Sequence, residues 1–394
     1  MTEQLSARLS TLQNRFFGIG LVGIGAACAG YVSDHHQFYK SYLVAYMFWF
    51  GLGIGCLALI MIHHLTKGRW GFVIQRFMEA GARTLPLLAL LFIPIVLGIG
   101  DLYLWADPEA VKADHFLQHK APYLNVPFFL GRAAFYFLLW VGVSFFLRRW
   151  SSQNDHSPSN KLMARMTLFS GPGVVAYVVT VSFASIDWIM SLDPHWYSTG
   201  YGTIFLVGQC LTAFAFSIIL LHLLGNEPVL AEVAKMERFW DLGNMMLAFV
   251  MLWGYITLTH FLIVWSGNLP EEITWYISRT AHGWEYVVWA LVAFHFSLPF
   301  MLLLHRRTKK NRYRLSKIAL VIIMMRFIEL HWLITPSFSH GGADAHHGMG
   351  LHWMDAVMPI AMGGLWLGAF CYFLRSQPLL PKNDPVLKEA LAHG

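Results

Sequence analysis

Charged residues are scarce in this sequence. Only 13% of its 394 residues are Asp, Glu, Lys or Arg, whereas 56% are apolar, and the mean hydropathy is +0.50. Soluble domains carry about 25% charged residues. A chain with so few charges cannot cover a water-facing surface of this size. The composition therefore excludes an ordinary soluble protein and indicates a surface that faces lipid.

Cysteine is also scarce, and no cysteine motif is present. The four thiols stand singly in apolar segments, at Cys28, Cys56, Cys210 and Cys371. There is no C-x-x-C, C-x-x-C-H or four-cysteine run, which argues against an iron–sulfur cluster or a covalently attached haem. Lone thiols in such settings are most often small buried hydrophobes. We therefore expect this chain to bind no metal and no redox cofactor of its own.

Long apolar runs dominate the sequence instead. A helix needs about 20 predominantly apolar residues to cross a hydrocarbon core of about 30 Å. About ten runs are of this kind, although glycines dilute the first. We predict an all-α membrane protein in which residues 1–394 form a single integral membrane domain, with spans near Phe16–Gly30, Tyr42–Ile62, Leu85–Trp105, Val126–Leu147, Leu168–Met190, Ile204–Leu224, Leu242–Trp265, Trp284–Leu304, Leu315–Ile334 and Met354–Leu374.

Lysine and arginine are distributed unevenly between the two sides of this topology. With the N-terminus inside, 22 of the 28 basic residues fall on the inner side, seven of them from Arg306 to Lys317. The outer side and the spans share Lys40, Lys112, Lys120, Arg132, Arg279 and Arg326. Because cytoplasmic loops are enriched in Lys and Arg, we predict that both termini are cytoplasmic. The basic pI follows from this asymmetry, and we expect no nucleic-acid partner.

Several ionisable side chains fall within the predicted spans, where they are costly and by default mark a pathway or a site. The topology places seven of them in the outer half, namely Asp101, Asp187, His260, His282, Glu285, Glu329 and His331. Desolvated carboxylates and histidines near neutrality can pass protons between water and a buried group. We predict a proton relay or quinone contact made by Asp101, Asp187, His260, Glu285, Glu329 and His331.

Structural roles for these residues remain open alternatives. Arg326 and Glu329 stand three apart on one predicted helix, where they can neutralise each other as an ion pair. His282 and His331 are close enough to the helix ends to be fully wet. No Lys or Arg stands three or four positions away from the remaining carboxylates, which are Asp101, Asp187 and Glu285. We therefore expect these three to form the core of the relay, opening to the outer face.

Other histidines raise two further alternatives. His282 and His295 are thirteen apart on one predicted helix, which is a spacing found for haem ligands. Two haems would need a second such pair, which is missing, and a single haem would need one partner, for which His260 is a candidate. The loop Ser339–His352 holds four histidines among glycines. Such a tract can bind a transition metal, but it lacks a fixed ligand spacing. We interpret it as a solvated outer loop.

Two short strings, four spans apart, are similar to each other. SIDW at 185–188 and ELHW at 329–332 each place a carboxylate before a tryptophan at the outer end of an outward-running helix. The similarity is weak, but it favours two four-helix bundles related by an internal repeat.

Longer strings carry a resemblance to a known family. They are SIDWIMSLDPHWYSTGYG (Ser185–Gly202), GLGIGCLALIMIHHLTKGRWG (Gly51–Gly71), RFWDLGNMMLAFVMLWGYITLTHFLIVWSGNLPEEITWY (Arg238–Tyr276) and RFIELHWLITP (Arg326–Pro336). These strings resemble the F subunit of alternative complex III, the bacterial quinol:electron-acceptor oxidoreductase that replaces the cytochrome bc complex. That subunit belongs to the broad polysulfide-reductase/NrfD-like membrane family. The resemblance covers the chain from about Asn14 to Leu374.

The resemblance implies two four-helix bundles flanked by one helix at each end, in the bacterial inner (cytoplasmic) membrane. It implies a respiratory or photosynthetic complex that passes electrons from quinol to cytochrome c or a copper protein. The partners would be a sister NrfD-like membrane subunit, an iron–sulfur subunit and c-type cytochrome subunits, besides membrane lipid. This chain would contribute a transmembrane proton path and, less directly, quinone binding, without catalysis alone.

Two other classes of function stay open. A free-standing secondary or proton-coupled transporter needs polar groups near the bilayer midplane, whereas most acids here are predicted toward the outer surface. A haem-bearing cytochrome b would show a Soret band in the visible spectrum. We expect the redox-complex subunit, relaying protons and contacting quinone.

Overall fold

The computed structural model describes residues 2–340 and 350–387. Within these stretches the regular structure is helical, and ten helical segments are long and apolar enough to cross a membrane. The predicted all-α membrane fold is therefore confirmed. The spans are α1 (Glu3–Ser33), α2 (His35–Thr66), α3 to α5 (Gln75–Ala82, Leu85–Leu90, Ile93–Leu97), α9 (Val126–His156), α10 (Asn160–Trp188), α11 (Tyr201–Leu224), α13 (Met236–Gly267), α15 and α16 (Trp284–Ala290, Leu298–Leu304), α18 (Arg312–Ile334) and α19 (Trp353–Arg375).

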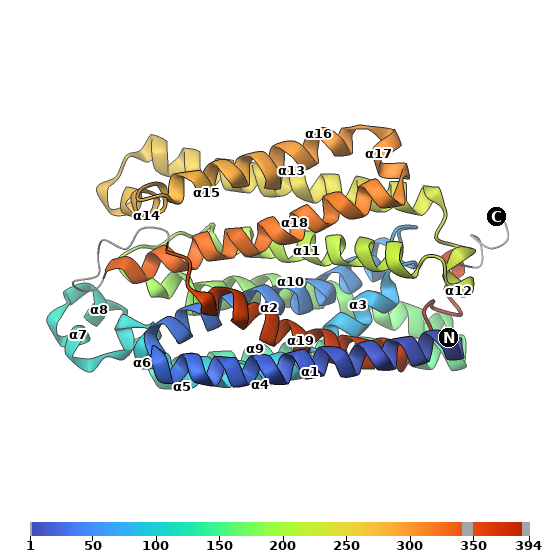
Figure 1. Cartoon of the computed structure of the whole chain (residues 1–394), viewed down its shortest axis with the longest axis horizontal. Coiled ribbons are helices and arrows are strands. Elements are labelled where there is room, and N and C mark those ends of the chain that lie inside the picture. Colours follow the sequence, from blue (N-terminus) through green and yellow to red (C-terminus); the bar gives the residue numbers. More distant parts are fainter. Residues whose placement is uncertain (1, 341–349, 388–394) are drawn as a thin grey trace.

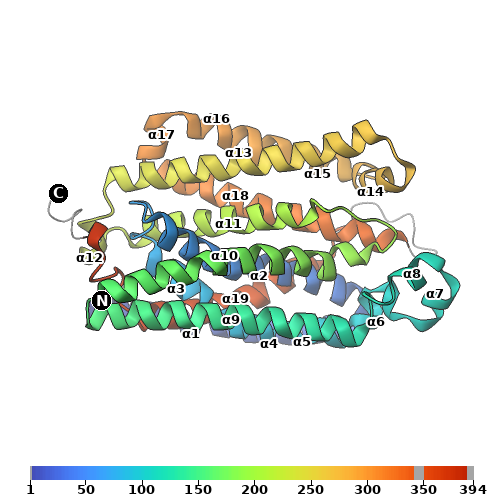
Figure 2. The ribbon, with the colours of Figure 1, turned by 180° about the vertical axis from the view of Figure 1, so that it is seen from behind.

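The spans pack as two four-helix bundles and one outer pair (Figures 1 and 2). The first bundle contains α2, the segmented span α3–α6 (α6 is Ile99–Leu102), α9 and α10. The second bundle contains α11, α13, the α15–α16 span and α18. The bundles meet where α2 and α10 contact α11 and where α2 contacts α18. The first and last spans, α1 and α19, pack along each other and against α2.

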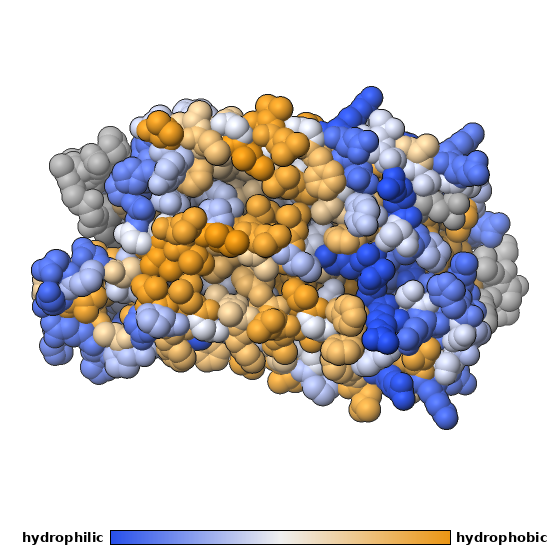
Figure 3. All heavy atoms as spheres, turned by 90° about the horizontal axis from the view of Figure 1, so that it is seen from below, coloured by the Kyte–Doolittle hydropathy of each residue, from blue (hydrophilic) through white to orange (hydrophobic). Residues whose placement is uncertain are grey.

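The molecule has two polar ends. The start of α1 and the end of α19 lie at one of them, which we call the terminal end, together with α12 (Pro228–Ala231) and α17 (Arg306–Lys310) (Figure 1). The opposite, distal end carries α7 (Pro108–Ala113), α8 (His115–Lys120) and α14 (Pro270–Thr280). Figure 3 shows hydrophilic residues gathered at both ends and a belt of apolar side chains between them. This is the surface expected of a chain that crosses a bilayer.

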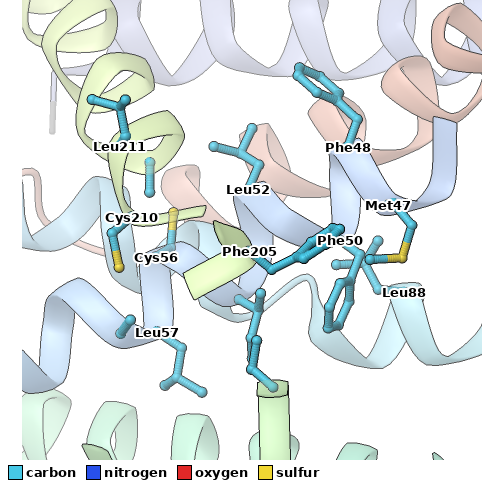
Figure 4. Close-up of a cluster of buried hydrophobic side chains, with 14 of the residues drawn as sticks. Met47, Phe48, Phe50, Leu52, Cys56, Leu57, Leu88, Phe205, Cys210 and Leu211 are labelled. Carbon is cyan, nitrogen blue, oxygen red and sulfur yellow. The ribbon is translucent and has the colours of Figure 1, made fainter. Parts of the chain in front are cut away.

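The α2 helix is the centre of the fold. In its most apolar stretch 94% of the residues are buried, whereas 22% are buried in the corresponding stretches of α1 and α13. Phe50 and Cys56 of α2 lie with Cys210 of α11 in the apolar core (Figure 4). Cys371 is buried as well, so three of the four thiols are small buried hydrophobes as expected, whereas Cys28 is exposed.

The third span departs from its predicted range of Leu85–Trp105. It begins at Gln75 and is divided into short helices, with Pro86 and Pro94 each in the first turn of a new segment. Proline lacks the backbone N–H that donates a hydrogen bond inside a helix. It is therefore tolerated in the first turn of a helix and interrupts a helix when it lies farther along. Because the span begins at Gln75, the segment Arg76–Glu79 lies inside the first bundle, whereas the predicted spans place it in an inner loop.

The glycines of the first span hold α1 against α19 rather than weakening the helix. A Cβ on Gly23 would lie 2.5 Å from the Cβ of Ala361, and one on Gly364 would lie 2.4 Å from the backbone nitrogen of Gly20. Small residues allow this close approach between membrane helices. The helix accordingly extends well beyond the predicted Phe16–Gly30.

Candidate functional site

A buried ion pair lies inside the second bundle, on α18. Arg326 and Glu329 are 3% and 2% exposed, and Arg326 Nη1 donates to Glu329 Oε2 at 2.6 Å. The indole of Trp253, on α13, donates to Glu329 Oε1 at 2.8 Å. The fully buried His295 ring lies 4.3 Å from the Trp253 ring, between centroids. We call these four residues the Glu329 cluster. The Arg326–Glu329 ion pair, left open as a structural alternative by the sequence, is present, with a hydrogen bond from Trp253 and the His295 ring nearby.

Local geometry explains how the Glu329 cluster forms. Residues three apart lie on one side of a helix, so Arg326 and Glu329 meet within a single turn. The guanidinium fits against α11 at Gly208, where an added Cβ would lie 2.3 Å from it. His295 belongs to a π-helical turn, Leu291–Ser297, between α15 and α16. Such turns are frequent at functional sites.

His295 differs from its neighbours in having unused polar atoms. Among the residues that the structure describes, neither of its ring nitrogens has a hydrogen-bond partner. A buried polar group without a partner costs about 1–3 kcal/mol. Water or a ligand that supplied the missing hydrogen bond would relieve this cost, beside the carboxylate–guanidinium pair.

The predicted relay residue Asp187 lies at the end of α10 and is 1% exposed. Arg132 of α9 binds both of its oxygens, from Nε to Oδ2 at 2.9 Å and from Nη2 to Oδ1 at 3.0 Å. The hydroxyls of Tyr123 and Tyr136 also donate to it, at 2.8 and 2.9 Å. Asp187 is therefore not an isolated acid, because the cation absent from its own helix comes from α9. We call Asp187, Arg132, Tyr123 and Tyr136 the Asp187 cluster.

An apolar cavity of about 260 Å³ adjoins the Asp187 cluster. Its walls include Tyr123, Ile186 and Met190, with Lys120 and Tyr197 toward the distal end. Burial raises the pKa of the Tyr123 phenol, which therefore remains a hydrogen-bond donor at neutral pH. Apolar walls with a few polar groups are typical of small-molecule sites.

A further buried ionic cluster was missed by the sequence analysis. Arg76 of α3 is 2% exposed and donates to Glu79 Oε2 at 2.6 Å and to Asp155 Oδ2, on α9, at 2.5 Å. The side chains of Gln75 and Ser151 donate to Glu79 Oε1 at 2.8 and 2.7 Å. This Arg76 cluster lies at the terminal end of the first bundle, where α3 folds back beside α2 and α9 (Figure 1).

A cavity of about 310 Å³, with many polar residues among those that line it, lies beside the Arg76 cluster. Its walls include Arg76 and Asp155, together with His63 and His64 of α2, which are 3% and 8% exposed. In the described part of the chain, His63 Nδ1 and His64 Nε2 have no hydrogen-bond partner. A cavity of this size with polar residues in its walls can hold several waters, so water can reach buried charge at this end of the first bundle.

A repeated string could have revealed the Arg76 cluster. Arg-Phe-x-acid occurs at 76–79, 238–241 and 326–329. In each case the arginine Nη1 donates to the acid three residues later, at 2.6, 3.0 and 2.6 Å respectively. Asp155 had no comparable signal, because its partner belongs to another helix.

Two of the predicted site residues lie nearer the surface. Asp101, on α6 at the distal end, has a side chain that is 28% exposed and lies 3.3 Å from one nitrogen each of His35 and His36. Glu285 accepts a hydrogen bond from the backbone N–H of Gly283 at 2.9 Å, which caps the start of α15. Within the described residues, no hydrogen bond or ion pair directly joins the three acids of the predicted relay.

The two predicted histidines belong to the second bundle. His260, on α13, shares hydrogen bonds with the hydroxyls of Ser198 at 2.8 Å and Tyr276 at 2.6 Å. His331, on α18, is half-buried, and its Nδ1 lies 3.3 Å from Thr335 Oγ1. Each histidine therefore has its own hydroxyl partners, and neither bonds to Glu329 in the part of the chain that the structure describes.

The haem and metal alternatives concern other histidines. His282 lies before α15 with a left-handed φ of 55°, so it does not share a regular helix with His295. Most of the histidine-rich loop, residues 341–349, lies outside the described residues.

The Arg279 guanidinium is another buried cation, at the end of α14. It stacks on Trp275 at 4.0 Å and donates to the carbonyl of Leu333 and the hydroxyl of Ser337. Burial lowers its pKa to about 10, so it is still charged at neutral pH. These bonds tie the distal loop of the second bundle to the end of α18.

The described part of the chain thus contains three buried clusters of ionisable groups, one in the distal half of each bundle and one at the terminal end of the first. Comparison of the sequence with protein-family models and with curated proteins finds no match.

Proposed function

We propose that this chain is an integral membrane subunit of a quinol:electron-acceptor oxidoreductase of the alternative complex III type, in a bacterial inner membrane. In this proposal the subunit contributes a transmembrane proton path and contacts quinone, and it has no catalytic activity alone. Its partners are a sister NrfD-like subunit, an iron–sulfur subunit and c-type cytochrome subunits. The ten-span arrangement in two four-helix bundles with two flanking helices supports this assignment.

The observation that carries the proposal is the Glu329 cluster. Ionisable residues inside membrane proteins are rare and by default functional, and this one combines a paired carboxylate with His295, whose nitrogens are unused in the described residues. In the proposed path His295 exchanges protons with water, while Glu329 and Arg326 provide the compensating charge.

The first bundle supplies the other parts of the proposal. Its cavity beside the Arg76 cluster gives protons an entry at the terminal end. The Asp187 cluster and the apolar cavity at Tyr123 give a place where a quinone ring can accept a hydrogen bond from a phenol. Asp101 and Glu285 stand nearer the distal surface, as exits for protons.

The orientation belongs to the proposal too. Basic residues concentrate in the segments at the terminal end, which we place in the cytoplasm beside anionic lipid. A cysteine introduced at Asn311, next to α17, should react with a membrane-impermeant reagent only after the cells are lysed. Labelling in intact cells would invert the topology.

The function is tested in the assembled complex with Glu329→Gln. This variant keeps the shape of the side chain and removes its charge and its capacity to titrate. We expect assembly with the haem and iron–sulfur subunits, and a loss of quinol-driven turnover or of proton release. The matched control is Asp241→Asn, since Asp241 pairs with Arg238 in the same string but is 30% exposed. Normal turnover and proton release in Glu329→Gln would overturn the proton-path assignment.

A free-standing transporter is the second candidate. The position of the Glu329 cluster favours it, since His295 lies in a π-turn midway along the eighth span, and transporters bind their substrates between repeats at interrupted helices. Purification from native membranes separates the two. A chain that comes alone, without haem c or iron–sulfur protein, would favour the transporter.

A further inference from the structure

Three metal-ligating side chains meet at the distal end of the first bundle, outside the clusters described above. His35 Nε2 and His36 Nδ1 each lie 3.3 Å from Asp101 Oδ1. The ligand atoms of the three residues all lie within 4.8 Å of one another. The two histidines begin α2, and Asp101 comes from α6, so two separate elements supply the set.

Two of the three separations match those of a tetrahedral metal site. Zinc binds histidine nitrogen at about 2.0–2.1 Å and carboxylate oxygen at about 2.0–2.2 Å. At a tetrahedral angle, these bond lengths place the nitrogen and oxygen ligands about 3.3 Å apart. Both nitrogen–oxygen separations in the structure have this value. The third separation, between the two histidine nitrogens, is at most 4.8 Å.

The fold holds these ligands in position. The N-cap residue Asp34 accepts a hydrogen bond from the backbone N–H of Gln37 at 3.0 Å, which fixes the first turn of α2. The His35 and His36 rings pack against each other with centroids 4.1 Å apart. Just before α6, Gly98 allows the chain to pass against the Tyr39 ring, where an added Cβ would lie 2.2 Å away. Side chains fixed in this way lose less freedom when a metal binds.

We propose that His35, His36 and Asp101 form a surface site for a divalent transition metal of the Zn²⁺ type, with water as the remaining ligand. Two imidazoles and a carboxylate are ligands that zinc accepts readily, and three protein ligands leave one position open. Exposure supports this, because the two imidazoles are 53% and 62% exposed, so a metal can enter from solvent. The proposal departs from the expectation, drawn from the sequence, that this chain binds no metal.

The test uses the full chain, in its native complex and purified without a polyhistidine tag. His346 and His347 are both replaced by alanine in every sample, because the loop that contains them can also bind metal. Zn²⁺ is titrated by calorimetry after chelator treatment, and Co²⁺ by its visible absorption. We expect one Zn²⁺ per chain and a Co²⁺ spectrum of the intense tetrahedral type.

Variants decide whether the metal occupies this site. His36→Ala should weaken Zn²⁺ binding by about tenfold or more, since it removes one of three protein ligands. Asp101→Asn should also weaken it, while keeping the shape of the side chain. The matched control is His195→Ala, because His195 contacts Asp114 on the same end and no third ligand joins them among the described residues. Equal affinity in the His36 and Asp101 variants and the parent would overturn the assignment.

A stability measurement guards against misfolding. His36 is exposed, so His36→Ala should unfold at the parent's temperature in the absence of metal. Zinc should raise the unfolding temperature of the parent and leave that of His36→Ala unchanged, since a ligand stabilises only the state that binds it. An equal rise in both proteins would place the metal elsewhere.

Discussion

The Arg-Phe-x-acid strings at 326–329 and 238–241 form the same kind of ion pair, but one pair is buried and the other is partly exposed. Arg326 and Glu329 are 3% and 2% exposed, whereas Arg238 and Asp241 are 12% and 30% exposed. In both pairs an arginine Nη1 donates to the carboxylate one turn later. The local spacing therefore decides that the pair forms, and the packing of other helices decides how much water it retains.

The difference in burial has an energetic meaning. An exposed pair is screened by water and contributes about 0–1 kcal/mol. A buried pair has lost that water, so the removal of one partner leaves an uncompensated charge and costs about 3–5 kcal/mol. A protein that contains a buried ion pair can therefore need both partners for its stability. Replacement of both residues by apolar ones can nevertheless give a protein that is equally stable. The same burial makes Glu329, rather than Asp241, the candidate for function.

The largest effect is expected from Arg326→Met, which leaves Glu329 charged inside the second bundle. We expect a loss of about 3–5 kcal/mol in the free energy of unfolding. The measurement is denaturant or thermal unfolding of the purified protein in mild detergent. The double variant Arg326→Met with Glu329→Met should recover much of the loss, because it removes both charges. A double variant as unstable as the single one would show that the pair does not act as a unit.

The next effect concerns the space that the guanidinium occupies. Gly208→Ala places a Cβ 2.3 Å from the Arg326 side chain, which must move. Overpacking of this kind costs about 1–3 kcal/mol. The control is Gly142→Ala on α9, where no atom lies within 4 Å of an added Cβ. We expect that variant to be neutral or slightly more stable in the same unfolding experiment, since alanine favours a helix.

A comparison of the Arg326–Glu329 pair with the Arg132–Asp187 pair shows which contacts can be predicted from a sequence. The Arg326–Glu329 pair could be predicted because both residues share one helical turn. The Arg132–Asp187 pair could not, since its residues lie 55 positions apart and meet only when α9 packs against α10. The ten spans were predictable because each depends on its own apolar run. The Arg76 cluster was missed because residues 75–84 contain Arg76, Glu79 and Arg83 and therefore form no apolar run.

A smaller loss of stability is expected from Asp187→Asn, which breaks the cross-helix pair. Asparagine keeps the shape and can still accept from Tyr123 or Tyr136, but Arg132 loses its counter-charge. Hydrogen bonds to charged groups contribute about 1.5–3 kcal/mol, and we expect a loss toward the lower value because Arg132 is 10% exposed.

Activity separates two roles for Asp187. If it relays protons, the assembled complex should form normally and lose quinol-driven turnover or proton release. If it only joins α9 to α10, the assembled complex should keep both. The variant Tyr136→Phe serves as a comparison, since it removes one hydrogen bond to Asp187 and leaves the charges in place.

The smallest effect is expected from Asp241→Asn, on the exposed member of the comparison. Asp241 is 30% exposed, so this pair is screened by water more than the Arg326–Glu329 pair, and Arg238 also lies 5.6 Å from the centre of the Phe72 ring. We expect the free energy of unfolding to change by less than about 1 kcal/mol, and quinol-driven turnover to remain at the parent value. The measurement is made beside Glu329→Gln, in the same detergent and at the same ionic strength. Equal losses in the two variants would mean that the string itself, and not its burial, sets the cost, and the Glu329 cluster would lose its claim to a separate role.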